Sequence, residues 1–467
     1  MVMVWFARAS VLSLLLFGLT ALTGAAEGPS PANAGPAILV PVPVGAPAAV
    51  PLALSAGDTA WMLVASALVL FMTIPGLALF YGGLVRTKNV LTIFTQCFAV
   101  CCLVTVLWML YGYSLAFSGA GAAAFSWHSL IGTLDKCCLI GVTPATAAPQ
   151  APTIPEPVFV LFQLTFAIIT PALLIGAFAE RIKFSAVLLI SALWLTVVYL
   201  PICHMAWAGP GALMGGLWGL QDLAGGTVVE VNSGVAGLVC CLMVGRRLGY
   251  PRTAMLPHNS AMCISGACML WVGWFGFNAG SAGAADGVAA RAALTTQIAA
   301  AAGGCSWMAI EWWRLRKPGA LGVVTGAVAG LVGITPACGT VGPLGALAIG
   351  VLCGGLSFLA VTRLKRRFGY DDTLDVFGVH GVAGMAGLIL TGVFAPAFLG
   401  GAGCALDHGW GGQIAVQAGC MALTAGYSAA GTALVVKLVD LAVGLRVDEA
   451  DEVNGLDYVQ HGEVAYT

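Results

Sequence analysis

The sequence predicts an all-α integral membrane protein with eleven transmembrane helices, in inverted five-helix repeats, after a cleavable signal peptide. Three observations lead to this fold class. Hydrophobic residues make up 59% of the 467 residues and charged residues only 8%, a balance far from that of a water-soluble domain. Apolar runs of membrane-spanning length recur along the chain. Positively charged residues are concentrated in alternate connections between these runs.

Residues 1–26 have the organisation of a secretory signal peptide. Arg8 supplies a positive charge, residues 9–23 form an apolar core, and Gly24-Ala25-Ala26 offers small residues for cleavage. Because this core is shorter than the ~20 residues that a span needs, we favour a cleaved signal over the alternative, an uncleaved first helix. Residues 27–56 contain seven prolines and are predicted to form an extended periplasmic segment.

Eleven apolar runs follow, each close to or above the roughly 20 residues that cross a bilayer as a helix. They cover residues 59–80, 90–117, 157–179, 184–206, 225–244, 256–278, 291–313, 319–338, 341–362, 374–397 and 413–443. One alternate set of connections contains 14 Lys and Arg residues, whereas the other contains only Lys136 and Arg291. The positive-inside rule makes the first set cytoplasmic, so the mature N-terminus lies outside and the C-terminus inside. A cleaved signal peptide predicts the same orientation.

Two ionisable residues lie inside predicted spans, in segments that echo each other. Glu230 precedes glycines by four and seven positions, and His380 precedes glycines with the same spacing. A charged side chain in a bilayer costs roughly 2.5–3.5 kcal/mol on insertion scales, so it marks a transport or proton path by default. The alternative is that both residues are polar contacts between helices. A pair at matching positions favours a transporter built from internal repeats.

The predicted orientation makes these repeats inverted. The helix with Glu230 enters from outside after Asp222, and the helix with His380 enters from inside after Asp372; each ionisable residue lies eight positions beyond its aspartate. Eight residues rise ~12 Å in a helix, so in a core ~30 Å thick the two side chains meet near the middle. We predict repeats at about 57–244 and 256–397, and an eleventh helix at 413–443 completes a membrane domain over 57–443.

Composition and motifs exclude several classes of function. A net charge of −1 gives no support to a nucleic-acid partner. The 15 cysteines lie mostly inside apolar runs, without the paired spacing of a disulfide scaffold and without a CxxC or HExxH metal motif. The sequence shows no set of nucleophile and base. We therefore expect no enzymatic activity, no cofactor and no metal site.

Several motifs, in order along the chain, resemble the ammonium transporter family (Amt/Mep/Rh) in its bacterial Amt branch. They are FMTIPGLALFYGG at 71–83, AER at 179–181, HMAW at 204–207, DLAGGTVV at 222–229, GWFGFNAGS at 273–281 and DVFGVHG at 375–381. The resemblance runs from about residue 57 to the end. It implies a homotrimer in the lipid bilayer, with a narrow pore in each subunit.

The resemblance also implies roles for particular residues. A substrate-binding site at the outer end would comprise Trp207, Ser281, Phe166 and Asp222; the rings of Phe166 and Phe277 would gate the pore; Glu230 and His380 would line it. These residue types suit a small cation, since an indole face attracts it by ~0.5–2 kcal/mol and a hydroxyl accepts a hydrogen bond from it. The alternatives are an interfacial tryptophan, core phenylalanines and an aspartate that caps a helix.

Glu230 departs from the pattern of most of this family, which carries histidine at that position. Beside His380 the carboxyl either ionises and pairs with an imidazolium or stays protonated, and the two groups titrate as one unit. Either state makes a proton-relay pair. Such a pair suits separate passage of ammonia and its proton, and it excludes potassium, which has no proton to give up.

We therefore expect inward transport of ammonium, and of methylammonium, across the bacterial cytoplasmic (inner) membrane. An ammonium sensor coupled to nitrogen signalling and an Rh-like gas channel are the alternatives. Residues 444–467 resemble the family's cytoplasmic regulatory tail, although their acidic composition alone predicts a flexible segment. The resemblance implies that a PII-type signal-transduction protein docks on this cytoplasmic face and blocks the pore when nitrogen is plentiful.

Overall fold

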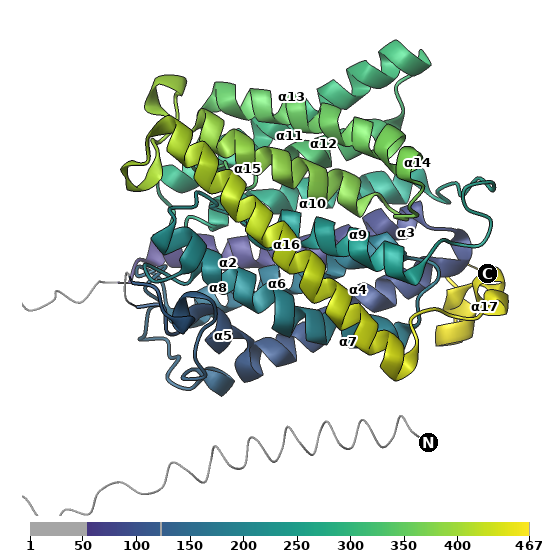
Figure 1. Cartoon of the computed structure of the whole chain (residues 1–467), viewed down its shortest axis with the longest axis horizontal. Helices are drawn as coiled ribbons and strands as arrows, with labels where there is room; N and C mark the ends of the chain where they lie inside the picture. The colour runs from purple at the N-terminus through teal and green to yellow at the C-terminus, as the bar shows by residue number, and fades with distance from the viewer. Residues whose placement is uncertain (1–53, 122–123, 467) are drawn as a thin grey trace, which may run out of the picture. The chain divides into compact units, whose positions relative to one another are not determined.

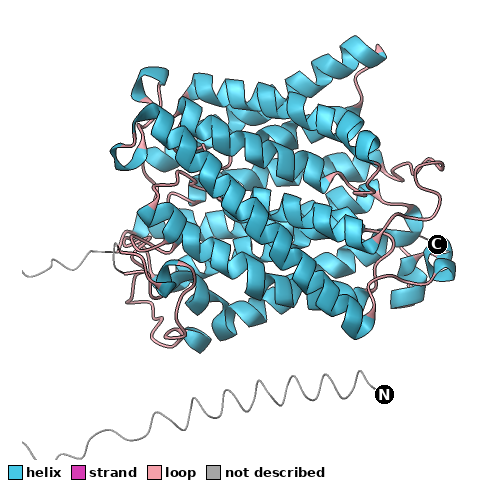
Figure 2. Ribbon diagram, in the orientation of Figure 1, coloured by secondary structure: helices cyan, strands magenta, loops and turns pink. Residues whose placement is uncertain are grey.

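The computed structural model describes residues 54–121 and 124–466 of the chain. The predicted signal peptide, and all but the last three residues of the predicted proline-rich segment, lie outside the described residues. Over the described ranges the secondary structure is helical, with two isolated β-bridges and no strand (Figures 1 and 2).

The first half of the described chain forms five long helical segments, several of which continue from one labelled helix into the next. They are α2–η1–α3 (Ala56–Phe71, Met72–Leu77, Ala78–Leu84), η2–α4–η3–α5 (Thr87–Asn89, Val90–Leu107, Trp108–Gly112, Tyr113–Phe117), α6 (Glu156–Phe178), α7–η6–α8 (Phe184–Trp194, Leu195–Tyr199, Leu200–Trp207) and η8–α9 (Gly226–Val231, Asn232–Val244). Short turns η4 (Trp127–Ser129), η5 (Cys137–Leu139) and η7 (Leu213–Leu217) lie in the connections.

The second half forms six further segments and the tail. They are α10 (Ser260–Gly280), α11 (Gly287–Leu315), α12 (Ala320–Ile334), α13–η9–α14 (Pro343–Leu359, Ala360–Leu364, Lys365–Phe368), η10–α15 (Phe377–Gly381, Val382–Phe394) and α16 (Gly409–Val443). The turns η11 (Ala397–Leu399) and η12 (Ala405–Asp407) precede α16, and α17 (Glu449–Asn454) and η13 (Asp457–His461) form the tail. Figure 1 shows α16 running obliquely across the helices, and it packs on α7, α9 and α15.

Nine of the described helical segments are long and apolar enough to cross a membrane, so this is a multi-pass membrane protein. The two other predicted spans coincide with α11, which has 29 residues but is less apolar, and α12, an apolar helix of 15 residues. These two helices pack against each other and against α13 through small residues. A Cβ added at Gly330 of α12 would lie 2.1 Å from the carbonyl oxygen of Ala299, so the backbones touch.

The helices that carry Glu230 and His380 cross each other at backbone contact. A Cβ at Gly234 would lie 2.2 Å from the backbone N of Gly381, and one at Gly384 would lie 2.8 Å from the Cβ of Glu230. Each crossing therefore needs a residue without a side chain. The contacts are reciprocal, since α9 packs on η10 and α15 packs on η8. These reciprocal contacts place Glu230 and His380 next to each other.

An aspartate caps each of these two helices. The Asp222 carboxylate accepts hydrogen bonds from the backbone N–H groups of residues 225, 226 and 227, at 2.9, 2.6 and 2.7 Å. The Asp372 carboxylate accepts one from the N–H of Phe377 at 2.8 Å. The first turn of a helix leaves N–H groups without partners, and a carboxylate there satisfies them and suits the helix dipole. The two caps explain where the two helices begin.

Candidate functional site

A cavity of about 510 Å³ in the described part of the chain contains three of the predicted binding residues, and we call it the Trp207 cavity. Trp207, Asp222 and Ser281 all line it. The indole N–H of Trp207 donates to the backbone oxygen of Asp222 at 3.0 Å, which fixes the ring. The Ser281 hydroxyl donates its proton to the carbonyl oxygen of Phe277 at 2.8 Å. The lone pairs of the hydroxyl oxygen therefore remain available to accept a hydrogen bond from a ligand.

The Asp222 carboxylate itself is committed to the helix. Besides the three backbone N–H groups it accepts a short hydrogen bond from the hydroxyl of Thr227, and the residue is 8% exposed. Burial raises the pKa of the carboxyl, while its hydrogen bonds to Thr227 and to the backbone oppose that shift. The carboxylate therefore organises this cavity by holding the helix N-terminus, while the backbone oxygen of the same residue fixes the indole.

Two phenylalanine rings stand between the Trp207 cavity and the centre of the helices. Phe166 and Phe277 stack with ring centroids 4.2 Å apart and planes 28° apart, and both side chains are fully buried. Phe166 and Trp207 meet edge to face, with ring centroids 5.8 Å apart. Phe277 lines the next cavity inward and Phe166 contacts Trp207 of the first cavity, so the pair lies between the two spaces. The structure thus brings together the rings that the resemblance named as a gate.

The next space, which we call the central cavity, has a volume of only about 10 Å³. Glu230 and His380 are the ionisable residues among the described residues that line it; the rest are aliphatic and aromatic side chains and a methionine. His380 Nδ1 and Glu230 Oε2 lie 2.7 Å apart, and the residues are 6% and 1% exposed. A volume near 10–15 Å³ holds about one water molecule. A hydrated cation does not fit this space.

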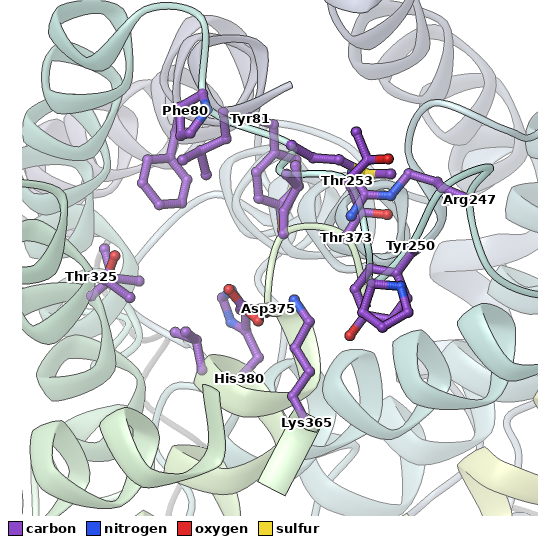
Figure 3. A pocket seen from close by; sticks show the side chains of 17 residues that line it. Phe80, Tyr81, Arg247, Tyr250, Thr253, Thr325, Lys365, Thr373, Asp375 and His380 are labelled. Atoms are coloured by element: carbon purple, nitrogen blue, oxygen red, sulfur yellow. Dashed lines mark hydrogen bonds and ion pairs between the residues drawn. The ribbon is translucent and has the colours of Figure 1, made fainter. Parts of the chain in front are cut away.

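A third cavity, of about 330 Å³, lies beyond His380, and we call it the Lys365 cavity (Figure 3). His380 lines both this cavity and the central one. In Figure 3 the side chains of Lys365 and Asp375 approach each other beside His380, and their Nζ and Oδ1 atoms are 2.7 Å apart. Asp372, whose carboxyl interacts electrostatically with both, is buried with its Oδ1 unpaired, and burial raises the pKa of this carboxyl to about 6.

Sequence reasoning missed the Lys365–Asp375 pair. Lys365 was counted among the charges of a cytoplasmic connection, and Asp375 opened a family motif without a role. The available signal was weak: it consisted of one basic and one acidic residue ten positions apart, either side of a turn.

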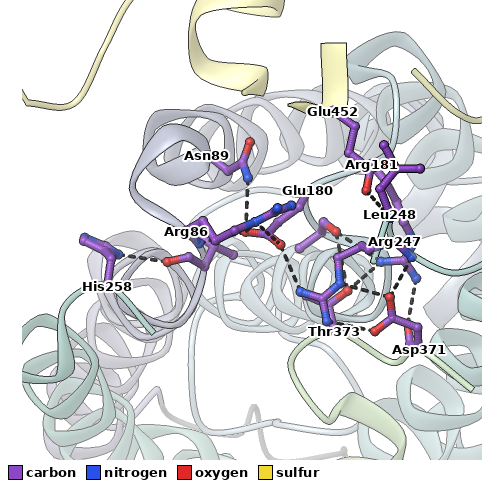
Figure 4. Close-up of polar contacts among 12 residues, drawn as sticks. Arg86, Asn89, Glu180, Arg181, Arg247, Leu248, His258, Asp371, Thr373 and Glu452 are labelled. Atoms are coloured by element: carbon purple, nitrogen blue, oxygen red, sulfur yellow. Dashed lines mark hydrogen bonds and ion pairs between the residues drawn. The ribbon is translucent and has the colours of Figure 1, made fainter. Parts of the chain in front are cut away.

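A buried ionic network joins four connections at the end of the helices that carries the basic loops, which we call the basic face (Figure 4). The Glu180 carboxylate accepts from Arg86 Nε at 3.0 Å, from Asn89 Nδ2 at 3.0 Å and from Arg247 Nη1 at 2.9 Å. Arg247 also donates to both oxygens of Asp371, at 2.8 and 2.9 Å. Because Arg247 lines the Lys365 cavity as well, the network holds one rim of that cavity.

The tail packs against the same face. The Asp457 carboxylate accepts from the backbone N–H groups of Leu91 and Thr92, at 3.0 and 2.7 Å, and so caps α4. Glu452 accepts from Arg446 at 2.6 Å and from the N–H of Leu248 at 2.7 Å. The backbone of residues 445–447 pairs with residues 181–183. Within residues 444–466 the tail is thus anchored by charged and backbone groups, not free.

Comparisons with known proteins agree with this geometry. Residues 60–466 match the model of the Ammonium Transporter Family. An ammonium transporter of Bacillus subtilis is 44% identical over 411 residues, which cover 88% of this chain and 98% of the relative. One of Mycobacterium tuberculosis is 46% identical over 433 residues, covering 88% and 90%. The crystal structure of Saccharomyces cerevisiae Mep2 superposes with a TM-score of 0.76 at 33% identity, covering 85% and 88%. A structure titled Sensor Amt Protein gives 0.79 at 25% identity, covering 87% and 98%.

Proposed function

Because this chain belongs to the ammonium transporter family, we propose that it carries ammonium, and methylammonium, inward across the cytoplasmic membrane of a bacterium through a pore in each subunit. One observation carries the proposal. A buried carboxyl–imidazole pair, 2.7 Å apart, lines an apolar space of about 10 Å³ that lies between two larger cavities.

Uptake begins in the Trp207 cavity. The indole face attracts the cation, worth ~0.5–2 kcal/mol depending on how far it is desolvated. The Ser281 hydroxyl accepts a hydrogen bond from it, and the backbone oxygen of Asp222 holds the indole in place. The indole face attracts potassium as well, since cation–π attraction acts on any cation. Potassium lacks N–H groups for the hydroxyl to accept, but because the indole attracts both cations, the rejection of potassium has to be completed in the step that follows.

That step is the loss of a proton. The central cavity excludes a hydrated ion, and a charge in apolar surroundings is costly. Ammonium gives its proton to the Glu230–His380 pair and crosses the apolar stretch as neutral ammonia. His380, which borders the Lys365 cavity, passes the proton onward to water on that side, and ammonia is reprotonated there. Potassium has no proton to release and is rejected.

We further propose eleven spans in inverted repeats, with the N-terminus outside, the basic face in the cytoplasm and a cleaved signal peptide. The tight packing of α11 and α12 on α13 supports their insertion despite lower apolarity or length. The reciprocal contacts of η8–α9 with η10–α15 support the inverted symmetry. The concentration of Lys and Arg in alternate connections supports the orientation.

An ammonium sensor coupled to nitrogen signalling is the second candidate. The structural similarity to a protein titled Sensor Amt Protein favours it. In that case the same cavities bind ammonium, but the output is a change at the basic face. We also propose a homotrimer whose basic face binds a PII-type signal-transduction protein, supported by the family membership and by the tail anchored there.

The proposal is tested by electrophysiology of proteoliposomes on a solid support, together with uptake of labelled methylammonium. We expect an ammonium pulse to give a current that follows protein density, and a potassium pulse to give none. Trp207→Leu should lose uptake at low substrate concentration by a factor of about 3–30, the worth of a cation–π contact. Trp207→Phe keeps an aromatic face and should lose less.

Unchanged concentration dependence in Trp207→Leu would make Trp207 an interfacial residue without a part in binding. Ammonium binding without current or uptake, in protein that is folded and reconstituted, would favour the sensor over the transporter.

The anchored tail gives a further expected result. Asp457→Ala removes the cap of α4, at about 1 kcal/mol, and should release the tail, so that limited proteolysis cuts residues 446–466 faster and uptake falls. Glu449→Ala is the matched control, because this carboxylate is exposed and makes no ion pair within the described residues. Truncation after Leu445 should reduce transport without impairing insertion. Normal uptake in both altered proteins would remove the tail from the transport mechanism.

A further inference from the structure

Lys365 differs from its basic neighbours in the direction of its side chain. Arg363 of η9 and Arg366 and Arg367 of α14 are exposed, whereas the side chain of Lys365 is only 14% exposed and lines the Lys365 cavity. Arginine and lysine side chains at a membrane-spanning segment normally extend to water. The inward direction of Lys365, toward the cavity that His380 borders, therefore indicates a specific role for its charge.

The contact that Lys365 makes is the one a free ammonium ion would make. Its Nζ lies 2.7 Å from Oδ1 of Asp375, whose side chain is 29% exposed. A lysine head group carries three N–H donors on one positive nitrogen, and ammonium carries four. The remaining ionic groups of this cavity are already paired, since Arg247 is held by Glu180 and Asp371 and His380 by Glu230. Asp375 is the carboxylate that lines the cavity and is left for a cation from the basic face, because Asp372, whose Oδ1 is unpaired, is buried and does not line it.

Building on the transport function proposed above, we propose that Lys365 is a tethered ammonium group that occupies the cation site of Asp375 and so excludes free cations from this end of the pore. Neutral ammonia passes the pair, because it neither competes for a carboxylate nor meets a repulsive charge. Ammonium or potassium on the basic face meets a site that is already filled and a positive charge in front of His380. Lys365 thereby determines cation specificity on this side of the Glu230–His380 pair.

The test uses the full-length protein in two preparations of sealed vesicles. In one the basic face is outside, and in the other it is inside. Uptake of labelled methylammonium is measured with potassium added on the side of the basic face or on the opposite side. The unaltered protein should be insensitive to potassium on the basic face. Lys365→Met exposes the Asp375 carboxylate, so potassium on that side should inhibit uptake about three- to tenfold, in line with the removal of one partly buried charge. Potassium on the opposite side should act as in the unaltered protein.

Three further variants separate this role from a structural one. Arg366→Met removes the same charge from the next residue, which is exposed, and should leave uptake insensitive to potassium. Lys365→Arg keeps the charge and should keep the insensitivity. Lys365→Met combined with Asp375→Asn removes the carboxylate as well and should restore insensitivity, a rescue that a loss of packing does not give. Lys365→Gln, which keeps a polar head group, is the second neutral variant if Lys365→Met is poorly folded.

The outcomes are distinct. Inhibition by potassium in Lys365→Met that the double variant abolishes supports the tethered ammonium. Neutral variants that are as insensitive as the unaltered protein, or an Arg366→Met variant that is equally inhibited, overturn it. Failure of the proposed transport function gives a different result from failure of the Lys365 proposal. In that case the unaltered protein itself takes up no methylammonium.

Discussion

Replacing Glu230 by leucine is expected to reduce ammonium transport on the order of 100-fold or more, the scale on which a positioned proton acceptor acts. The carboxylate lies 2.7 Å from His380 Nδ1 in a space with no other ionisable lining residue among those described. Leucine removes the proton acceptor and leaves the buried imidazole unpaired, at about 1–3 kcal/mol. Ammonium-evoked current and methylammonium uptake, normalised to protein amount and measured from pH 5 to 8, report the loss.

Two other substitutions show which property of Glu230 matters. Glu230→Gln keeps the shape and one hydrogen bond but cannot take the proton, so transport should fall nearly as far as with leucine. Glu230→His provides a second imidazole, as most of the family has, and should transport with a different pH dependence. Currents equal to those of the unaltered protein at every pH in the leucine variant would end the proton-relay hypothesis.

Replacing Glu180 by alanine is expected to lower the free energy of unfolding by up to about 3–5 kcal/mol, because it removes one of the two carboxylates that pair with the buried Arg247. The Glu180 side chain is fully buried and pairs with Arg247, whose side chain is 7% exposed, and with Arg86. Thermal unfolding of the purified protein in detergent measures the effect. Arg363→Ala is the control: it removes an exposed charge on the same face that has no ion pair in the described residues, and it should change stability by less than about 0.5 kcal/mol.

The same network predicts a pH dependence. Burial alone would raise the pKa of Glu180, but Arg247 and Arg86 outweigh burial and lower it; Arg247 does the same for Asp371. A carboxyl whose folded-state pKa is lowered stabilises the protein fully above its ordinary pKa, and this stabilisation is lost as the pH falls through the folded-state value. Thermal stability of the unaltered protein should therefore drop below about pH 4, whereas Glu180→Gln should show a shallower drop. Equal slopes would mean that other carboxyl groups dominate acid unfolding.

The central pair was predictable from sequence because it depends on a pattern that sequence displays. Glu230 and His380 each stand eight positions after an aspartate and four before a glycine, so the local sequences already indicate which two residues are equivalent. The capping role of Asp222 follows likewise from its position at the start of a helix. Pairing across 150 residues needed no further information, since an ionisable residue in an apolar span has few other partners.

The residues on the basic face could not be predicted in this way. Apolar patterns end where charges begin, so the run at 341–362 was cut before Lys365, whereas the helix continues through the basic residues to Phe368. Whether a basic residue there faces water or a cavity depends on what packs beside it. Glu180 presents the same difficulty, because its partners come from other connections that are distant in sequence. Hydrophobic periodicity carries no information on such contacts.

The crossing of η8–α9 with η10–α15 has a consequence for biosynthesis. The ribosome delivers Glu230 to the membrane 150 residues before its partner. Until His380 follows, the nascent first half holds a carboxyl in a span without its counterpart, at roughly 2.5–3.5 kcal/mol on insertion scales. The unpaired helix can stay in the membrane during this interval only if the carboxyl of Glu230 is protonated or the translocation machinery holds the helix. A gene fragment that stops after Val244 should therefore give a product that quality control removes, and co-expression of the missing half should rescue it.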